Sequence, residues 1–126
     1  MNDELPDVLR RYLDAYNQKD VDAMLSTMTA DVVFENISNS SEPRRTMGKA
    51  ALEALARQSA SVFSSRRQTV VDAIVSSSRI ALMIEFEAVL TSDMSNGWKA
   101  GQTVRMIGAS FFTLREGLIA KVVDFS

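Results

Sequence analysis

The second half of the chain is a succession of predicted β-strands, and this feature limits the possible folds more than any other. From Arg66 onward, stretches rich in Val, Ile, Phe and Thr alternate with short clusters of turn residues. One of these clusters contains Asn96-Gly97, which tolerates the positive φ angles of a tight hairpin. Gly101 and Gly108 interrupt the longest stretch, 98–114, and glycine inside a strand often marks a bulge or a bend. The pattern predicts four consecutive strands joined by hairpins, in a sheet that can curl.

Helical periodicity dominates the first half of the chain. Apolar residues recur three and four positions apart, and Asp20 is suited to cap the second helix. The expected elements are helices over 5–18 and 21–28, a strand over 31–37, a loop over 38–43 and a third helix after Gly48. Helices followed by an antiparallel meander predict one α+β domain over 1–126, a cone-shaped, strongly curved antiparallel sheet packed with three N-terminal helices. The interior of such a cone can hold a ligand.

The chain of 126 residues contains no Cys and no His. This absence excludes disulfides, thiol nucleophiles, a Ser-His-Asp triad, His-ligated zinc and a His general base. Any acid–base chemistry has to come from carboxylates, Tyr, Lys, Arg, Ser or Thr, or from a bound cofactor. We predict no metal and no cofactor.

The charge pattern argues against nucleic acid and membranes as partners. Fourteen Lys and Arg against sixteen Asp and Glu leave a net charge of -2. The longest basic runs are the scattered pairs Arg10-Arg11, Arg44-Arg45 and Arg66-Arg67, which we interpret as solvated surface. The N-terminus has no apolar signal segment, and no apolar run approaches the ~18 residues that read as a membrane span. We therefore expect a cytoplasmic protein.

Several segments carry a family resemblance. Arg11-Tyr12-Leu13, Asp20 to Ala23 and Asp31 to Asn36 follow one another as two helices and a strand. Gly48 precedes a helix, and Gly108 to Ile119 forms a final hairpin. Together they resemble the nuclear-transport-factor-2-like superfamily, in its branch of SnoaL-like polyketide cyclases and ketosteroid isomerases. The resemblance covers nearly the whole chain and implies a cone-shaped fold with a pocket for a hydrophobic small molecule.

The resemblance also implies site residues. In the isomerases a Tyr and a protonated Asp hold an oxyanion, while a second Asp moves the proton. The Tyr corresponds to Tyr12, the base to Asn36, and the oxyanion-hole acid to Ser110. Because an Asn side chain cannot take a proton at neutral pH, we do not expect steroid isomerisation by this mechanism.

Asp124 is the main remaining candidate for a base. It interrupts the apolar run from Val122 to Phe125, and the resemblance points its side chain into the cone. Burial there would raise its pKa and suit it to proton transfer. The alternative is an exposed acid at the end of a strand. Glu85 and Glu87 share one strand face, either as an acid pair or as solvated side chains. The side chains expected to line the pocket are Tyr16, Phe34, Ser110, Phe112 and Trp98.

These observations predict a small enzyme of the SnoaL-like type. It would carry out cofactor-independent acid–base chemistry, as an isomerase, cyclase or hydratase, on a hydrophobic carbonyl compound. Tyr12 and Asn36 would polarise an oxygen and Asp124 would move the proton. The alternatives are a non-catalytic module that binds a hydrophobic ligand and a protein that only pairs chains. The apolar outer face of the sheet predicts a homodimer.

Overall fold

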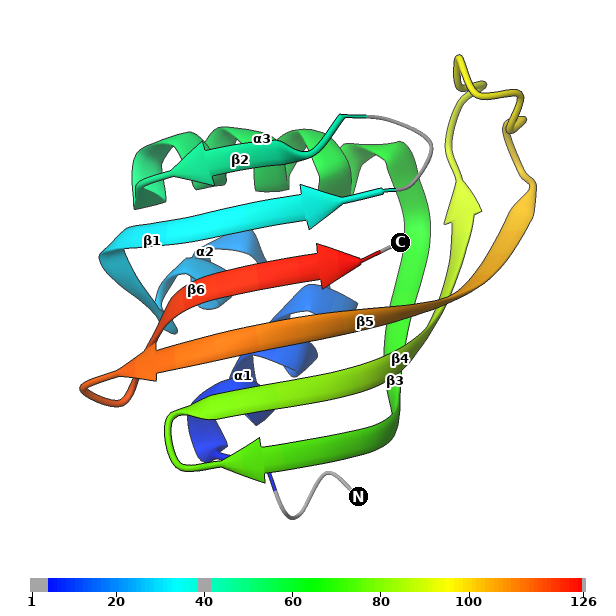
Figure 1. The fold of residues 1–126 in the computed structure, drawn as a ribbon. Helices are drawn as coiled ribbons and strands as arrows, with labels where there is room; N and C mark the ends of the chain where they lie inside the picture. The colour runs from blue at the N-terminus through cyan, green and yellow to red at the C-terminus, as the bar shows by residue number, and fades with distance from the viewer. Residues whose placement is uncertain (1–4, 39–41, 126) are drawn as a thin grey trace.

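The chain folds into one six-stranded sheet with three helices on one side of it (Figure 1). The computed structural model describes residues 5–38 and 42–125. The helices are α1 (Asp7–Asn17), α2 (Val21–Leu25) and α3 (Lys49–Val62). The strands are β1 (Met28–Ile37), β2 (Arg44–Met47), β3 (Phe63–Ser76), β4 (Arg79–Leu90), β5 (Thr103–Arg115) and β6 (Leu118–Phe125). This arrangement confirms the predicted α+β class. None of the helices in the described ranges is long and apolar enough to cross a membrane.

Neighbouring strands pair antiparallel, with one exception. The order across the sheet is β2-β1-β6-β5-β4-β3. The strands β3 to β6 form the predicted meander, and β2 pairs antiparallel with β1. In contrast, β1 and β6 run parallel. The expectation of a purely antiparallel sheet is therefore corrected at this one pair, where the meander brings the last strand back beside the first.

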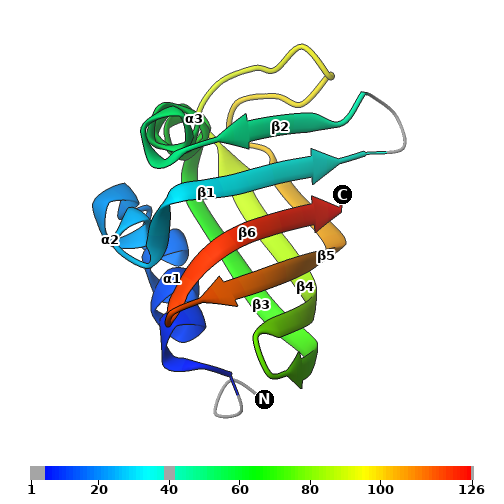
Figure 2. The ribbon, with the colours of Figure 1, turned by 60° about the vertical axis from the view of Figure 1, so that its left-hand side comes forward.

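The sheet is strongly twisted and curls around the helices. In Figure 2, β3 and β4 run at a steep angle to β1 and β6, and the helices lie together on the inner side. Deeply buried residues between the sheet and the helices include Leu9, Val32, Phe112, Ile119 and Val122. In β5, a side chain at Gly108 would lie 2.8 Å from the Phe125 carbonyl oxygen. Glycine therefore permits the close approach of these two strands.

The two N-terminal helices meet where the sequence predicts a corner. Asp20 caps α2 as expected, accepting a hydrogen bond from the Ala23 N–H at 3.1 Å. However, α2 ends at Leu25, and β1 begins earlier than predicted. The Thr27 hydroxyl donates to the Met24 carbonyl at 2.6 Å, so a side chain occupies an acceptor of the last turn.

The short strand β2 was not predicted. Two of its four residues are charged and three are exposed, without the apolar alternation that marks a strand. It lies at an edge of the sheet, where β1 is its one strand partner. Of the loop predicted over 38–43, residues 39–41 lie outside the described residues.

The connection between β4 and β5 is a long loop, 91–102, and not the predicted tight hairpin. A turn does form at Asn96-Gly97, where Gly97 has a φ of 100°. Next to it, the Met94 N–H donates to the Trp98 carbonyl at 2.7 Å. The turn lies at the tip of the loop. The turn residues therefore predicted the position of the bend, but they did not predict where the two strands end. Gly101 also lies in this loop and not in a strand.

Candidate functional site

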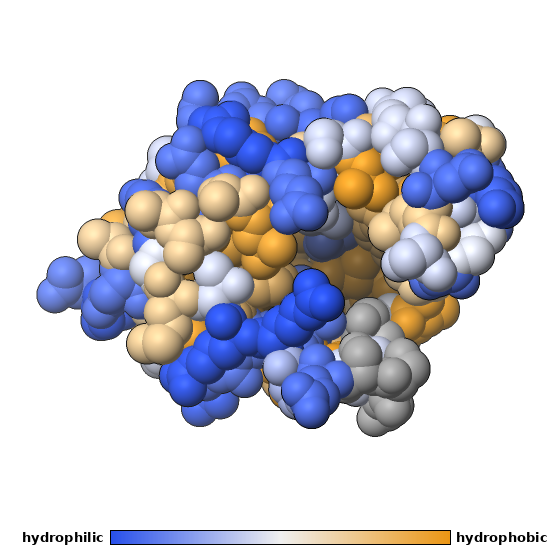
Figure 3. Space-filling model, turned by 90° about the horizontal axis from the view of Figure 1, so that it is seen from above, coloured by the Kyte–Doolittle hydropathy of each residue, from blue (hydrophilic) through white to orange (hydrophobic). Residues whose placement is uncertain are grey.

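A cavity of about 940 Å³ opens between the inner face of the sheet and the helices. Seen from above, the surface is hollowed, with hydrophobic residues in the hollow and many hydrophilic residues around it (Figure 3). The side chains most relevant to its chemistry are Tyr12, Tyr16, Phe34, Asn36, Arg66 and Asp124. A smaller cavity of about 250 Å³ shares Tyr16, Asn36 and Asp124 with the first and is also lined by Ser110 and Trp98.

The strand register brings three of the predicted residues side by side. Asp124 on β6 lies opposite Asn36 on β1 and opposite Ser110 on β5. Strand alternation puts all three on the face of the buried residues Val122 and Phe112, which is turned to the helices. The Ser110 hydroxyl donates to Asp124 Oδ1 at 2.6 Å. We call Asn36, Asp124 and Ser110 the polar row.

Asp124 is half-buried at the cavity and has few polar contacts. Among the described residues, its side chain receives one hydrogen bond, from Ser110, and forms no ion pair. Burial raises the pKa of Asp124 to about 6, against a smaller lowering by the Ser110 hydrogen bond. Asp124 is therefore an acid facing a cavity, and not the exposed acid of the alternative interpretation. A carboxyl with this pKa can both accept and return a proton near neutral pH.

Tyr12 and Tyr16 project from one face of α1 into the cavity. The Tyr12 ring packs edge-on against Phe112, with ring centres 5.6 Å apart, and lies 6.4 Å from the Tyr16 ring. Burial, followed by the charge of Asp124, raises the pKa of Tyr12 well above its usual value of 10.0. Its hydroxyl therefore stays protonated. Within the described residues this hydroxyl has no hydrogen-bond partner, so it can donate to a ligand oxygen.

Arg66 is a cavity residue that the sequence interpretation missed. The Arg66-Arg67 pair, interpreted as solvated, divides between the two faces of β3, so that Arg67 is exposed and Arg66 is only 4% exposed. Arg66 Nε donates to the Tyr16 carbonyl at 3.0 Å, and its guanidinium carbon lies 3.8 Å from the centre of the Tyr16 ring. Burial lowers the pKa of Arg66. The alternation of side chains along a strand is the signal that could have found it.

Hydrogen bonds fix the end of α1 against β3 and so position Tyr16 beside Arg66. The Asn17 side chain accepts from the Gln68 N–H at 2.7 Å and donates to the Gln68 carbonyl at 3.2 Å. The Lys19 ammonium donates to the Phe63 carbonyl at 2.7 Å. This wall of the cavity is therefore held by backbone contacts on both sides of Arg66.

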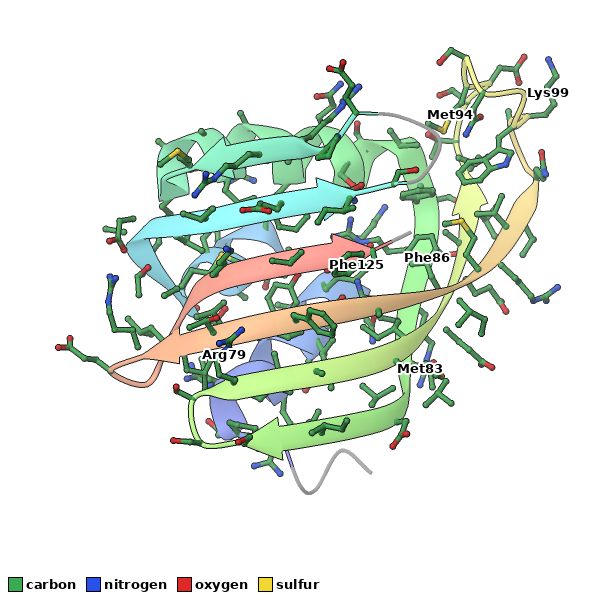
Figure 4. The ribbon with its side chains drawn as sticks, in the orientation of Figure 1. Arg79, Met83, Phe86, Met94, Lys99 and Phe125 are labelled. Atoms are coloured by element: carbon green, nitrogen blue, oxygen red, sulfur yellow. The ribbon has the colours of Figure 1, made fainter. Side chains whose placement is uncertain are left out.

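The other predicted pocket residues occupy different positions. Phe34 lines the large cavity, on the same side of β1 as the polar row. Trp98, in loop 91–102, borders the smaller cavity together with Phe86 and packs in a cluster that includes Met94. Figure 4 shows Phe86 on β4 and Met94 in the loop beyond it. Phe112 lines neither of these two cavities, because it lies behind Tyr12 in the core and is 2% exposed.

Glu85 and Glu87 point away from the cavity. Both are exposed, and Glu87 accepts a hydrogen bond from Arg105 at 2.9 Å. The structure therefore favours the solvated alternative for this pair. In the described part of the chain, no three Asp or Glu side chains are grouped so that they could hold a metal ion.

The family model for the SnoaL-like domain matches residues 9–122. The chain belongs to the SnoaL-like family. It is a small-molecule pocket protein of this type, with the nuclear-transport-factor-2-like fold that the resemblance implied. A search of curated proteins gave no match.

Solved structures similar to this SnoaL-like chain include two candidate polyketide cyclases. The one from Pseudomonas putida is 27% identical, covers 96% of this chain and 90% of its own, and has a TM-score of 0.75. The one from Xanthomonas campestris is 26% identical, covers 94% and 87%, and has a TM-score of 0.74. A hypothetical protein with a ketosteroid isomerase-like fold from Catenulispora acidiphila, in complex with trimethylamine, has a TM-score of 0.79, with 96% and 85% covered. At 10% identity, this last likeness concerns the fold alone.

Proposed function

We propose that this SnoaL-like protein is a cytoplasmic, cofactor-independent enzyme that moves a proton on a hydrophobic carbonyl compound. The observation that carries the proposal is the placement of Asp124 in the cavity, with one carboxylate oxygen held by Ser110 at 2.6 Å. The other oxygen has no partner within the described residues and is available to a ligand. A pKa of about 6 suits this carboxyl to accept a proton and then return it.

In the proposed step, the Asp124 carboxylate takes a proton from the carbon next to the carbonyl. The C–H bond breaks, an O–H bond forms on Asp124, and the electron pair moves to the carbonyl oxygen to give an enolate. In a β,γ-unsaturated carbonyl compound the enolate extends over the double bond, and return of the proton to its far carbon gives the conjugated isomer. Alternatively, the enolate carbon attacks a second carbonyl of the same molecule, and the resulting alkoxide takes the proton from Asp124. This second course closes a ring, in line with the candidate polyketide cyclases that the chain resembles.

Tyr12 and Asn36 are proposed to hold the developing enolate oxygen. The Tyr12 hydroxyl is a protonated donor in a buried setting, where hydrogen bonds to a developing charge are strong. The Asn36 amide lies beside Asp124 in the polar row and can donate but cannot act as a base. This division leaves the proton transfer to Asp124.

The proposal is tested with 2-tetralone, a hydrophobic ketone whose α-hydrogens exchange with solvent through an enolate. In D₂O, we expect the native protein to accelerate deuterium incorporation, followed by NMR. Asp124→Asn should lower this rate about 100-fold or more, the usual range for loss of a general base. Asp72→Asn, on the exposed surface of β3, is the matched control and should leave the rate unchanged.

Two outcomes would contradict the proton-transfer proposal. One is an Asp124→Asn rate close to that of the native protein. The other is saturable binding of 2-tetralone by the native protein without any exchange. This second result would support the non-catalytic binding module, for which the apolar cavity is sufficient.

We also propose that two copies of the chain pair through the outer face of the sheet. Met83, Ile107, Phe111 and Phe125 are 47%, 63%, 45% and 37% exposed on three neighbouring strands. Figure 4 shows Met83 and Phe125 on the outer side of β4 and β6. The rings of Phe111 and Phe125 pack 5.3 Å apart and form a continuous apolar surface, which a second copy can cover in an isologous contact.

The dimer is tested by sedimentation equilibrium. The native protein should have twice the chain mass of 13.9 kDa, and Phe111→Glu should have the single-chain mass. Met47→Glu, at an exposed position on the edge strand β2, is the control and should remain dimeric. A native protein of single-chain mass would overturn the pairing.

A further inference from the structure

Arg66 is a buried cation without an anionic partner. Within residues 5–38 and 42–125, no carboxylate forms an ion pair or a hydrogen bond with it. The groups it contacts are neutral: the Tyr16 carbonyl, the Tyr16 ring and the Met24 sulfur, which lies 3.8 Å from Nη2. Buried arginines are rare in proteins unless they are paired, because removing a charge from water costs free energy. These contacts hold the guanidinium in position but do not compensate its positive charge.

Arg66 borders the cavity and keeps one guanidinium nitrogen without a partner. Arg66 is among the residues that line the cavity, although only 4% of its surface is exposed. Nε is used by the Tyr16 carbonyl and Nη2 contacts the Met24 sulfur, whereas Nη1 has no partner within the described residues. The Tyr16 ring covers one flat side of the group. What remains is Nη1, whose N–H groups can donate charge-assisted hydrogen bonds to a carboxylate.

A second cation supports the same preference at the cavity mouth. Arg44 on β2 lies opposite Asn36 in the strand register and also lines the cavity. Its side chain is exposed and makes no ion pair within the described residues. The acids that line the cavity are Glu42, which is exposed, and Asp124, and neither forms an ion pair with Arg66 or Arg44 within the described residues. The cavity therefore holds two unpaired cations that an anionic group can neutralise.

We infer that the ligand of this cavity carries a carboxylate, which Arg66 binds beside Tyr16. Tyr16 lies next to both groups, because its ring packs on the Arg66 guanidinium and it also lines the smaller cavity with Asn36, Asp124 and Ser110. The ligand is thus a hydrophobic keto acid. The keto group of this ligand rests on the proposed function. The carboxylate does not, because it is inferred from the unpaired Arg66 side chain.

The competing explanation is that Arg66 only ties α1 to β3 through the Tyr16 carbonyl. The two explanations are separated with 2-naphthoate and 2-naphthamide, which share their shape and differ in charge. Calorimetric titration of the native protein should give about tenfold or tighter binding of 2-naphthoate, as expected for a hydrogen bond between charged groups. Arg66→Met should bring the two affinities to within about twofold of each other. Arg67→Met, the neighbouring arginine on the exposed face of β3, is the matched control and should keep the native ratio.

Equal affinities in the native protein, or an unchanged ratio in Arg66→Met, would overturn the inference. Should Arg66→Met fail to fold, the native protein supplies the test through the ¹⁵Nε resonance of Arg66. This signal should shift on addition of 2-naphthoate and stay in place with 2-naphthamide; no shift with 2-naphthoate overturns the inference. The two proposals fail separately, because anion preference without 2-tetralone exchange removes only the proton transfer. Exchange without anion preference removes only the carboxylate.

Discussion

The two faces of the sheet treat charged side chains in opposite ways. On the outer face, Glu87 contacts Arg105 at 2.9 Å and Glu35 contacts Lys121 at 3.5 Å. On the inner face, Arg66 and Asp124 form no ion pair within the described residues, although Arg66 is buried and Asp124 is half-buried. Exposed ion pairs contribute only about 0–1 kcal/mol, whereas a buried charge without a partner is costly. Ion pairs thus form on the outer face, where they contribute little to stability, whereas Arg66 and Asp124 on the inner face stay unpaired. This contrast is the reason for proposing that the two inner side chains bind a ligand.

Two aspartates show the same contrast. The hydrogen bond from the Arg115 side chain, the largest of several causes, lowers the pKa of exposed Asp31 to about 2. In the cavity, burial raises the pKa of Asp124 to about 6. The two carboxylates should therefore contribute to stability with opposite signs, and pH is the variable that separates them.

The largest expected effect is a stabilisation by Asp124→Asn at high pH. Between about pH 4 and 6 the folded protein binds the Asp124 proton more tightly than the unfolded chain does, so the free energy of unfolding falls as pH rises. A raised pKa of about 6 against 3.8 corresponds to a penalty of about 3 kcal/mol above that range. Asn keeps the shape and removes the charge. Urea unfolding should show Asp124→Asn to be more stable than the native protein by up to about 3 kcal/mol near pH 8, and nearly equal near pH 3.

Asp31→Asn is the matched variant, and we expect it to change the free energy of unfolding in the opposite direction. Because its pKa is lowered in the folded state, Asp31 stabilises the protein above pH 3.8, and this contribution is lost as pH falls toward 2. Asp31→Asn should therefore be less stable than the native protein near pH 8. A change of the same sign in both aspartate variants would contradict the contrast between the two environments.

Part of the inner face could be predicted from the sequence, because strand alternation there agrees with the faces seen in the tertiary structure. Strand alternation, together with the family resemblance, pointed to Asn36, Ser110 and Asp124 one residue at a time. Their assembly into the polar row depends on register, and that includes the parallel pairing of β1 with β6. Arg66 was missed because the interpretation took a pair of arginines as solvated, without asking which of the two alternates inward.

Other features could not be predicted, because distant contacts decide them. Alternation puts Phe112 on the same face as Ser110, but it does not reveal that Tyr12 of α1 covers Phe112. The Asn96-Gly97 turn was found, yet the strands stop short of it where Trp98 and Met94 pack on a separate apolar cluster. Local preferences therefore located bends and faces, whereas helix packing decided which part of the inner face stays open to a ligand.

The smallest expected effect concerns the outer face of the sheet and tests whether its exposed ion pairs contribute little to stability. Glu87 and Arg105 lie opposite each other on β4 and β5, with side chains 57% and 74% exposed. In a double-mutant cycle of Glu87→Gln and Arg105→Gln made in the single-chain variant Phe111→Glu, water replaces each lost contact, so the coupling free energy should be about 0.5 kcal/mol or less. Added salt should reduce it further, because exposed charges are screened. A coupling free energy as large as the Asp124→Asn effect would mean that ion pairs on the outer face do stabilise the fold. The difference between the two faces of the sheet would then no longer support a special role for the unpaired charges of Arg66 and Asp124.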